Sequence, residues 1–483
     1  MDKIKFTMEA KTYGSFDVIV CGGGTAGVVA ALAAAREGAN TLLMESSNAL
    51  GGMLTTGNAG LTKYVLHGSD PDHQYEIDKE LGVNPENVLV AGGIPLELTN
   101  RMIKEGMALG NYGTGMHYVY PDVHQFKQFL FEELQKAGVR ILLHCKAIEV
   151  VKTGDKVDGV IFDSKAGPLV AYGKYIIDAT GDGDVAVLAG AEYTIGTTKE
   201  DCAVKEGLVE EGKIHNPGSM FRVGGVDFDK FVAFIKANPD RFTPHMFGLM
   251  KLEEFIEEYE KGDAIETFIK LKDEQGEYKR RFQVYNNPRE QVMVGCISCK
   301  TGLNCLDVDE YTLAEYQAMD AATRQLQHIK REIDGFENAF IIDVPLGVRE
   351  TRHIQGEHLM TIEDIVNNVD YEDTIGISSH PIDTHPRPSF MENMKAPDRA
   401  WFRVPYRSTV VKGFDNLYVA GRQISATHEA FGCIRPTICC MVIGEAVGTA
   451  AAMLTKNGKG EKAKDIDVKS LQAKLKENGV KIR

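Results

Sequence analysis

A glycine-rich turn between an apolar run and an alanine-rich run is the feature that most constrains the fold of this chain. The turn reads Gly22-Gly23-Gly24-Thr25-Ala26-Gly27 and matches the pattern G-x-G-x-x-G. Residues 16–21 before it are typical of a buried strand, and residues 26–38 after it are typical of a helix that ends at a glycine. Residues 41–44 predict a second strand. Together they predict one βαβ unit of the Rossmann type, which binds nucleotides.

The turn has the chemistry that a pyrophosphate requires. Glycines let the backbone approach the phosphates closely, and the helix N-terminus offers free N–H groups and a partial positive charge. Glu45 stands 18 residues after Gly27, at the end of the second predicted strand. There a carboxylate can accept hydrogen bonds from ribose hydroxyls. A glycine turn that serves only packing is the alternative, and the complete strand–turn–helix–strand context argues against it.

NAD fits this unit as well as FAD does, but three further segments favour FAD. Leu50-Gly51-Gly52-Met53 follows Glu45 closely, residues 178–183 end a later strand, and residues 416–422 precede a second helix rich in glycine and alanine. That helix, at residues 438–454, carries only Glu445 as a charge. We expect it to be a buried helix packed on a sheet, with a membrane span as the alternative.

The other elements predict an α/β chain: a split Rossmann-type FAD-binding domain with an inserted α+β substrate domain. Residues 217–401 are more charged and have mixed periodicity, which indicates the insertion. The expected FAD-binding parts are residues 14–63, 111–205 and 412–455, with a cap segment at 64–110, the insertion at 206–411, and a C-terminal linker and helix at 456–483. Further helices are expected at residues 95–109, 123–137, 253–261, 313–333 and 468–478, and a polar loop at 67–78.

Composition limits the partners and the compartment. The formal net charge of −15 argues against a nucleic-acid partner, because a phosphate backbone needs a basic patch. Nine cysteines, several of them inside apolar runs, fit a reducing cytoplasm better than a disulfide framework. Residues 1–15 have no apolar stretch of the signal-peptide type. We therefore expect a cytoplasmic protein without a membrane span, and the oligomeric state stays open.

Three motifs carry a resemblance to a known family: residues 347–357 (GVRETRHIQGE), 405–408 (PYRS) and 420–430 (AGRQISATHEA). With them, the sequence resembles the FAD-dependent oxidoreductases of the glutathione-reductase-like fold, in their fumarate-reductase-related branch. More closely, it is similar to a bacterial, mostly uncharacterised group of these enzymes. The resemblance covers nearly the whole chain and implies FAD bound in an extended form.

The resemblance also implies which residues hold the cofactor. Those expected around FAD are Gly22, Gly24, Thr25, Ala26, Gly27, Glu45, Ser46, Gly51, Gly52, Met53, Ala147, Ile148, Thr180, Gly181, Gly421, Arg422 and Thr437. Ala147 or Ile148 would contact the adenine through the backbone, and the helix that begins near Thr437 would point at the flavin. Relatives with a covalent flavin use a histidine in the loop after the Gly-Gly pair. Residues 53–58 contain no histidine, so we expect non-covalent FAD.

Arginines and histidines are dense between Arg349 and Arg435, which is unusual in so acidic a chain. Converging arginines can bind a carboxylate or phosphate, and a histidine can move a proton. The candidate catalytic residues are His428, as the proton-handling group, with Arg349, Arg407 and Arg435. The alternatives are a structural role for His428, and ion pairs of Arg349 and Arg352 with Glu350 and Glu357 that only fix a loop. The spacing of histidines in residues 380–388 matches no ligand pattern, and no metal site is expected.

Cys296, Cys299 and Cys305 allow three interpretations. They can be a redox-active pair, part of an iron–sulfur cluster, or buried thiols. We favour buried thiols and expect no cluster, because no fourth ligand is evident.

The leading functional hypothesis is an FAD-dependent enzyme that transfers a hydride between a small, anionic organic substrate and flavin N5, at a C–C or a C–OH bond. The rival is a flavin-bearing subunit that passes electrons to a partner protein. A redox-neutral flavoenzyme is a minor third. The sequence names neither the substrate nor the electron donor or acceptor.

Overall fold

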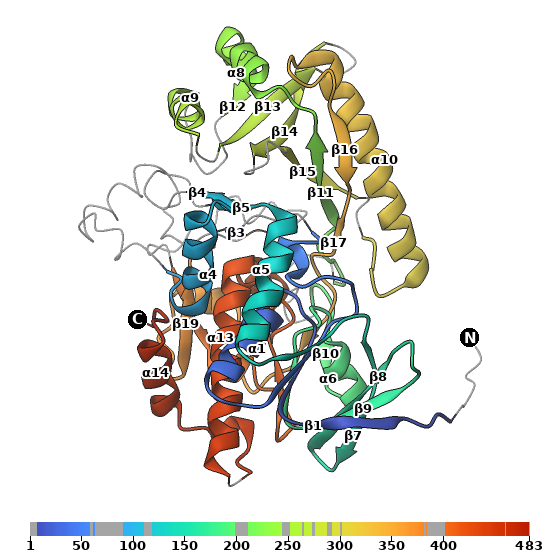
Figure 1. The fold of residues 1–483 in the computed structure, drawn as a ribbon, viewed down its shortest axis with the longest axis vertical. Coiled ribbons are helices and arrows are strands. Elements are labelled where there is room, and N and C mark those ends of the chain that lie inside the picture. The colour runs from blue at the N-terminus through green and yellow to red at the C-terminus, as the bar shows by residue number, and fades with distance from the viewer. Residues whose placement is uncertain are drawn as a thin grey trace.

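Two β-sheets with their own helices lie one above the other along the long axis of the molecule (Figure 1). The computed structural model describes residues 7–57, 61–62, 90–110, 118–198, 211–243, 252–262, 265–272, 276–286, 292–299, 302–380, 383, 401–458 and 460–482. The lower part of Figure 1 combines the first third of the chain with its C-terminal region, and the upper part comes from the middle of the chain.

The lower sheet has seven strands in the order β6-β2-β1-β9-β8-β7, with β21 paired to β9. Its five parallel strands are β6 (Arg140–Leu142), β2 (Thr41–Met44), β1 (Lys11–Cys21), β9 (Leu169–Asp178) and β21 (Leu417–Val419). The strands β7 (Lys146–Thr153) and β8 (Lys156–Asp163) continue it in antiparallel fashion. Val18, Ile19 and Val20 are fully buried, as expected for parallel strands covered on both faces.

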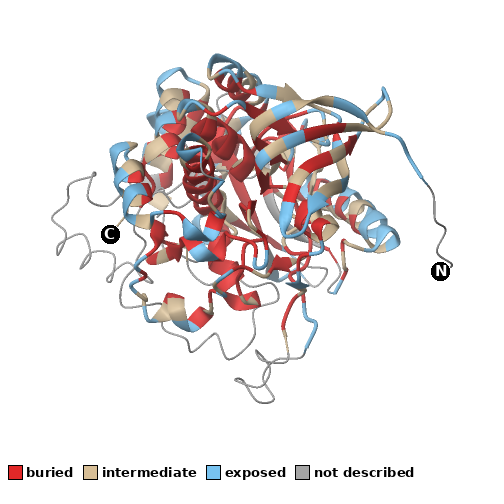
Figure 2. Ribbon diagram, turned by 90° about the horizontal axis from the view of Figure 1, so that it is seen from below, coloured by how far each residue is buried: buried red, intermediate tan, exposed pale blue. Residues whose placement is uncertain are grey.

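Helices α1 (Thr25–Arg36) and α13 (Thr437–Asn457) pack closely against each other. A Cβ added at Gly444 would lie 2.3 Å from the carbonyl oxygen of Ala26, and one at Gly448 would lie 2.2 Å from that of Ala30. Helix α13 is long and apolar enough to cross a membrane, but 94% of its apolar window is buried among other parts of the protein. It is a core helix of this fold, and Figure 2 shows such buried residues gathered in the centre of the molecule.

The upper sheet is antiparallel, in the order β12-β13-β14-β15-β11-β16, with β17 paired to β11. Its strands are β11 (Gly218–Gly224), β12 (Phe242–Thr243), β13 (Glu266–Lys272), β14 (Tyr278–Asn286), β15 (Val292–Ser298), β16 (Phe340–Asp343) and β17 (Leu346–Gly347). Three helices accompany it: α8 (Phe228–Ala237), α9 (Leu252–Glu260) and α10 (Val308–Glu332). Phe221, Phe282 and Phe336 lie in a separate hydrophobic core, as expected for an inserted unit.

The second core ends earlier than the expected boundary at residue 411. Its buried members run to Ala339, apart from Tyr120, which joins it from the first half of the chain. Four later elements contribute to the core of the lower part instead: β18 (His353–Ile354), α11 (Ile362–Val366), β19 (Thr374–Ser378) and β20 (Phe402–Pro405). Strand β19 packs against α13, with Gly376 facing Val442. The chain therefore returns to the lower part near residue 347, although the more charged stretch of the sequence continues to residue 401.

The remaining elements lie outside the two large sheets. A small sheet of β3 (Leu61–Thr62), β5 (Tyr118–Pro121) and β4 (Ala108–Gly110) lies between them, and Tyr120 stacks on Tyr285 of β14 with ring centroids 4.3 Å apart. The other helices are α4 (Gly93–Lys104), α5 (Val123–Lys136), α6 (Asp184–Ala189), α12 (His428–Ile434) and α14 (Val468–Glu477), and β10 (Tyr193–Thr194) pairs with β18.

The expected helix at residues 95–109 is too long at its C-terminal end. Helix α4 ends at Lys104 because Gly106 takes a positive φ of 70° and residues 108–110 then pair with β5. The polar loop expected at 67–78 lies outside the described residues. The α/β class and the Rossmann-type architecture are confirmed.

Candidate active site

A cavity of about 500 Å³ opens at the carboxyl ends of the parallel strands. Ligands of open α/β sheets bind at this edge. Fourteen of the seventeen residues expected to hold FAD line the cavity: Gly22, Gly24, Thr25, Ala26, Glu45, Ser46, Gly52, Met53, Ala147, Thr180, Gly181, Gly421, Arg422 and Thr437. Gly27, Gly51 and Ile148 are not part of the wall.

The three glycines of the G-x-G-x-x-G pattern have different tasks. Gly22 has φ of +102°, and an added Cβ would lie 2.3 Å from the carbonyl oxygen of Ala179. At Gly27 an added Cβ would lie 1.8 Å from the carbonyl oxygen of Gly22, so this glycine allows the helix to pack on the turn. At Gly24 an added Cβ meets nothing within 4 Å, because this residue faces the cavity. The backbone at Gly24 is thus open to a bound group.

The N-terminus of α1 is available to an anion. Its N-cap is Gly24, which supplies no side-chain cap, and its first turn carries no acidic residue. The amides of the first turn have no partners within a helix. Thr25 and Ala26, which begin this turn, both line the cavity. The open glycine and the uncapped helix end fit the pyrophosphate of a dinucleotide.

Glu45 follows β2 directly and links the second strand to the glycine turn. Its Oε2 accepts a hydrogen bond from the amide of Gly23 at 2.7 Å. Its Oε1 accepts from the amide of Ser47 at 2.7 Å and from the Ser46 hydroxyl at 3.2 Å. The carboxylate is therefore fixed at the cavity wall, where the sequence predicts a ribose.

The Gly51-Gly52 pair packs on the same turn from the other side. The amide of Gly51 donates to the carbonyl oxygen of Gly23 at 2.8 Å, and a Cβ at Gly52 would lie 3.0 Å from the Cα of Gly24. Gly51 therefore supports the turn from outside the cavity wall. The backbone of this pair is in the left-handed region at both positions, which favours glycine.

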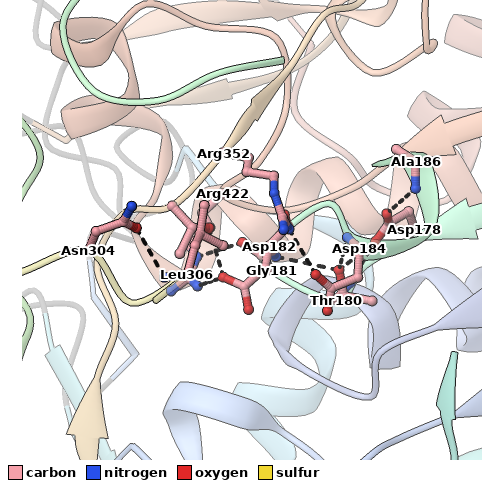
Figure 3. A network of polar contacts seen from close by, with 11 residues as sticks. Asp178, Thr180, Gly181, Asp182, Asp184, Ala186, Asn304, Leu306, Arg352 and Arg422 are labelled. Carbon is pink, nitrogen blue, oxygen red and sulfur yellow. Dashed lines mark hydrogen bonds and ion pairs between the residues drawn. The ribbon is translucent and has the colours of Figure 1, made fainter. Parts of the chain in front are cut away.

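A network of polar contacts joins residues at and next to the cavity wall (Figure 3). Arg422 donates from Nε to the carbonyl oxygen of Gly181 at 2.7 Å, and its terminal nitrogens reach the carbonyl oxygen of Val348 and the carboxylate of Asp182. Arg352 donates to Asp184 Oδ1 at 2.9 Å and to the carbonyl oxygen of Asp182 at 2.8 Å. The network ties the segment after β17 to the cofactor domain.

Asp178 anchors the loop that carries Thr180 and Gly181. It is fully buried, and it accepts hydrogen bonds from Thr180 N and Oγ1 and from Ala186 N. Burial raises the pKa of Asp178 to about 6, although these hydrogen bonds act in the opposite direction. The loop is thus held in place by a carboxyl group that loses much of its hydration in the fold.

Arg435 also lines the cavity, beside the N-terminus of α13. Arg435, Thr437 and Cys440 all line the wall there. One terminal nitrogen of Arg435 is paired with the carboxylate and the carbonyl oxygen of Asp383. Its Nε is buried and has no hydrogen-bond partner among the described residues. Of the four candidate catalytic residues, Arg435 is the one that the structure brings to the cavity.

The other three candidates lie outside the cavity wall. Arg407 pairs with Asp373, with 3.0 Å between Nε and Oδ2. Arg349 donates to the carbonyl oxygen of Asn216 at 2.5 Å. The alternative, in which Arg349 and Arg352 pair with Glu350 and Glu357, differs from the contacts in the structure, where Glu350 bonds to His353 and His428, and Arg352 bonds to Asp184.

His428 belongs to a buried group of side chains around Glu350. Its Nδ1 lies 2.8 Å from Glu350 Oε1, and Nε2 of His353 lies 2.6 Å from the same oxygen. Burial would raise the pKa of Glu350, but the nearby imidazoles of His428 and His353 outweigh it and hold the pKa well below its usual range. This placement does not support His428 as the proton-handling group at the cavity, and we assign it to the buried group instead.

Sequence reasoning missed several residues of the cavity wall. Tyr311 reaches it from α10, and Leu346 and Val348 reach it from the segment at and after β17. The 347–357 motif contains Val348, so its position was open to inference. Tyr311 gave no such signal, because it stands in an ordinary amphipathic helix far along the chain.

The cysteines near this site are buried thiols where the structure describes them. Burial raises the pKa of Cys299, and it raises the pKa of Cys305 to about 11. Thiols that stay protonated are poor nucleophiles and poor metal ligands. The side chain of Cys296 lies outside the described residues, so its role stays a prediction.

Two curated proteins each match about a third of this chain. A segment of 202 residues, 35% of this chain, is 24% identical to the NADH:fumarate oxidoreductase of Klebsiella pneumoniae (strain 342) and spans 20% of that protein. A segment of 175 residues, again 35% of this chain, is 26% identical to the thiamine thiazole synthase of Pyrococcus horikoshii and spans 58% of it. The chain thus matches less than two thirds of the length of these relatives.

Solved structures resemble this chain along most of its length. A geranylgeranyl bacteriochlorophyll reductase-like protein from Thermoplasma acidophilum aligns with a TM-score of 0.45 and 15% identity, over 97% of this chain and 84% of that chain. The family of FAD dependent oxidoreductases matches residues 17–475. This match covers nearly the whole sequence. The chain therefore belongs to the FAD dependent oxidoreductase family and is an enzyme with FAD as its cofactor.

Proposed function

We propose that the enzyme transfers a hydride between a small anionic organic substrate and N5 of non-covalently bound FAD. The bond that reacts would be a C–C or a C–OH bond. FAD, when bound, supplies the hydride chemistry, and the protein supplies binding, orientation and electrostatics. The observation that carries the proposal is the position of Arg435 on the cavity wall, next to the N-terminus of α13.

Two positive groups converge at this end of the cavity. Arg435 lines the cavity, and the pairing of its guanidinium with Asp383 fixes its orientation. The N-terminus of α13 adds a partial positive charge, and the helix has no side-chain cap there. An anionic substrate would be held by hydrogen bonds to the arginine, and negative charge that develops in the reaction would be stabilised.

One tyrosine and two apolar residues of the wall would keep water away from the substrate. Tyr311 and Leu346 belong to the upper part of the molecule, Val348 follows it directly, and all three border the same cavity as Arg435. Together they would shield the reacting carbon from water once a substrate is bound. The substrate would therefore lie at the junction of the inserted unit with the cofactor domain.

We further propose that the chain belongs to the fumarate-reductase-related branch of its family. The partial match to an NADH:fumarate oxidoreductase supports this, since that protein's name implies reduction of a dicarboxylate. The match to a thiamine thiazole synthase is of similar extent, so the branch needs a direct test. No described cysteine favours the rival hypothesis of an electron-transfer subunit, because Cys299 and Cys305 are buried thiols.

An anaerobic screen tests the proposal. The purified holoprotein is mixed with a panel of hydroxy acids and saturated dicarboxylates, and bleaching of the flavin absorbance is followed. The protein reduced with dithionite is mixed with unsaturated dicarboxylates, and recovery of absorbance is followed. Each acid is compared with its neutral amide or ester. We expect an acid to react and its neutral analogue to react much more slowly. Equal rates with neutral analogues would rule out an anion-binding site, and no reaction without an added protein partner would favour the electron-transfer subunit.

A further inference from the structure

Three buried side chains from distant parts of the sequence meet in the interior, and none of them lines the cavity. They are His215, just before β11, Glu350, just after β17, and His428, the first residue of α12. One ring nitrogen of each histidine and one carboxylate oxygen all lie within 4.8 Å of one another. The three residues are 1%, 2% and 5% exposed, respectively. We call this set the His–Glu–His cluster.

The carboxylate of the cluster is held by several donors. Glu350 Oε2 accepts a hydrogen bond from the backbone amide of His215 at 2.6 Å. Its Oε1 lies 2.8 Å from Nδ1 of His428 and 2.6 Å from Nε2 of His353. Carboxylates that bind metal ions are oriented by such hydrogen bonds from neighbouring groups. His353 would be one of these orienting neighbours, because its Nε2 already serves Glu350.

The imidazoles are held by an aromatic side chain. The ring of Phe431 meets the ring of His215 edge-on at 5.3 Å between centroids and that of His353 at 4.7 Å. The rings of His215 and His428 lie 4.5 Å apart at 52°. Phe431 is 1% exposed, so this side of the cluster is closed to water. A low-dielectric surrounding strengthens any interaction between a cation and the carboxylate.

We propose that the His–Glu–His cluster binds one divalent transition-metal ion. Two imidazole nitrogens and one carboxylate oxygen are a donor set typical of zinc and iron(II) sites. The set lies outside the cavity that fits FAD, so the proposal does not depend on the proposed substrate. The sequence predicts no metal here, because the three ligands stand 78 and 135 residues apart and form no local spacing pattern.

Metal binding needs an adjustment of the ligand distances. Ligand atoms at about 2.0–2.2 Å from one ion in a tetrahedral site are about 3.3–3.6 Å apart. The pair formed by His428 Nδ1 and Glu350 Oε1, at 2.8 Å, would have to separate slightly. The nitrogen of His215, within 4.8 Å of the other ligand atoms, would have to move toward the ion.

A proton competes with the metal ion for the His–Glu–His cluster. In the structure the short contact between His428 and Glu350 is a hydrogen bond, so one proton lies between them. Binding of a metal ion would release that proton to the solvent and form bonds from the ion to both atoms. The ion would then join the two segments of the chain that flank the upper part to α12, and α12 leads directly to Arg435.

Zinc retention tests the proposal on the FAD-loaded protein. Wild-type protein and the variants Glu350→Gln, His215→Gln and His328→Gln are incubated with Zn²⁺, desalted, and analysed for zinc by mass spectrometry. His328→Gln is the matched control, because His328 also bonds a carboxylate, Glu332, at 2.7 Å but has no third ligand among the residues that the structure describes. We expect about one zinc ion per chain in wild type and control, and a loss of about tenfold or more in the two cluster variants. An unchanged flavin spectrum shows that the variants are folded.

Wild-type protein provides a measurement that does not depend on any variant. X-ray absorption at the zinc edge gives the distance to the first ligands. We expect a nitrogen and oxygen shell near about 2.0–2.1 Å. A sulfur shell near about 2.3 Å would assign the metal to cysteines and overturn the proposal. Zinc retention near zero in wild type, or equal retention in all four proteins, would overturn it as well and leave the proton as the occupant.

Discussion

Glu45 accepts a hydrogen bond from the backbone amide of Gly23, with 2.7 Å between Oε2 and the nitrogen. The acidic residue at the end of β2 and the glycine turn after β1 are therefore one unit. The contact uses one oxygen of the carboxylate, and the other oxygen bonds to Ser46 and Ser47. A ribose that binds here meets a carboxylate whose position is already fixed.

Replacing Glu45 should weaken FAD binding. In Glu45→Ala the ribose loses its acceptor and the turn loses the contact at Gly23, so we expect a loss of about 1–3 kcal/mol in binding free energy. Fluorescence titration of the apoprotein with FAD measures it. Glu149→Ala is a suitable control, because Glu149 lies on β7 outside the cavity wall. Unchanged FAD affinity in Glu45→Ala would show that the ribose is held elsewhere.

The sequence predicted this unit because its signals are local. The turn, its flanking strand and helix, and Glu45 stand within about 30 residues, the length of one βαβ unit. The contacts between distant segments were not accessible in this way. Glu350 meets His428 across 78 residues, and Arg422 meets Gly181 across 241. Periodicity places each residue on a helix or strand but does not say which elements pack together. For this reason the glycine turn was predicted correctly, while the surroundings of His428 and Arg407 were not.

Gly24 and Gly27 allow cofactor binding to be separated from folding. In Gly24→Ala the methyl group points into open cavity space, and φ of −72° suits alanine. The protein should fold normally and lose about 1–3 kcal/mol of FAD affinity, because the methyl group meets the pyrophosphate.

Gly27→Ala should instead destabilise the fold. Its Cβ would lie 1.8 Å from the carbonyl oxygen of Gly22, so α1 must move away from the turn. We expect destabilisation of about 3 kcal/mol or more, measured by urea unfolding of the apoprotein. Equal stability of Gly24→Ala and Gly27→Ala would contradict the assignment of different tasks to the two glycines.

FAD should leave the protein on denaturation. The described part of the loop after the Gly-Gly pair, residues 53–57, contains no histidine for a covalent bond. After precipitation with acid, the yellow colour should appear in the supernatant, as free FAD. A washed pellet that stays yellow would show covalent attachment.

Glu445 should make the fold less stable as the pH rises. It lies in the middle of α13, and its Oε2 accepts from the amide of Ile94 at the start of α4. Burial raises the pKa of Glu445 to about 8 from an ordinary value of 4.5, although the hydrogen bond from Ile94 and the charge of Arg36 act in the opposite direction. The folded protein keeps this proton where the unfolded chain loses it. The stability is therefore complete below about pH 4.5 and declines as the pH rises to about 8.

Glu445→Gln should remove this decline, because the amide oxygen can still accept from Ile94 and carries no proton to lose. We expect a gain of about 4 kcal/mol at pH 8 and none at pH 4.5. Urea unfolding across this pH range measures it. Burial also raises the pKa of Asp178, to about 6. The stability of the Glu445→Gln variant should therefore still decline between pH 4 and 6, but by less. Glu149→Gln, at an exposed position on β7, is the control, and equal pH profiles of the two variants would contradict the role of Glu445.

Replacing Arg435 and replacing Arg407 should distinguish two positions for an anionic substrate. Both are arginines paired with an aspartate, but Arg435 lines the cavity and Arg407 does not. In Arg435→Lys the charge is kept, so Asp383 stays paired, while the planar group that can bind a carboxylate with two hydrogen bonds is lost. We expect flavin reduction by the substrate to slow by about 10²-fold, the effect of losing one well-placed charged donor, with FAD content unchanged. Arg407→Lys should react as the wild type does. Stopped-flow measurement of flavin absorbance with the acid found in the screen compares the three proteins. If Arg407→Lys slows the reaction and Arg435→Lys does not, the substrate lies near Asp373 rather than beside the N-terminus of α13.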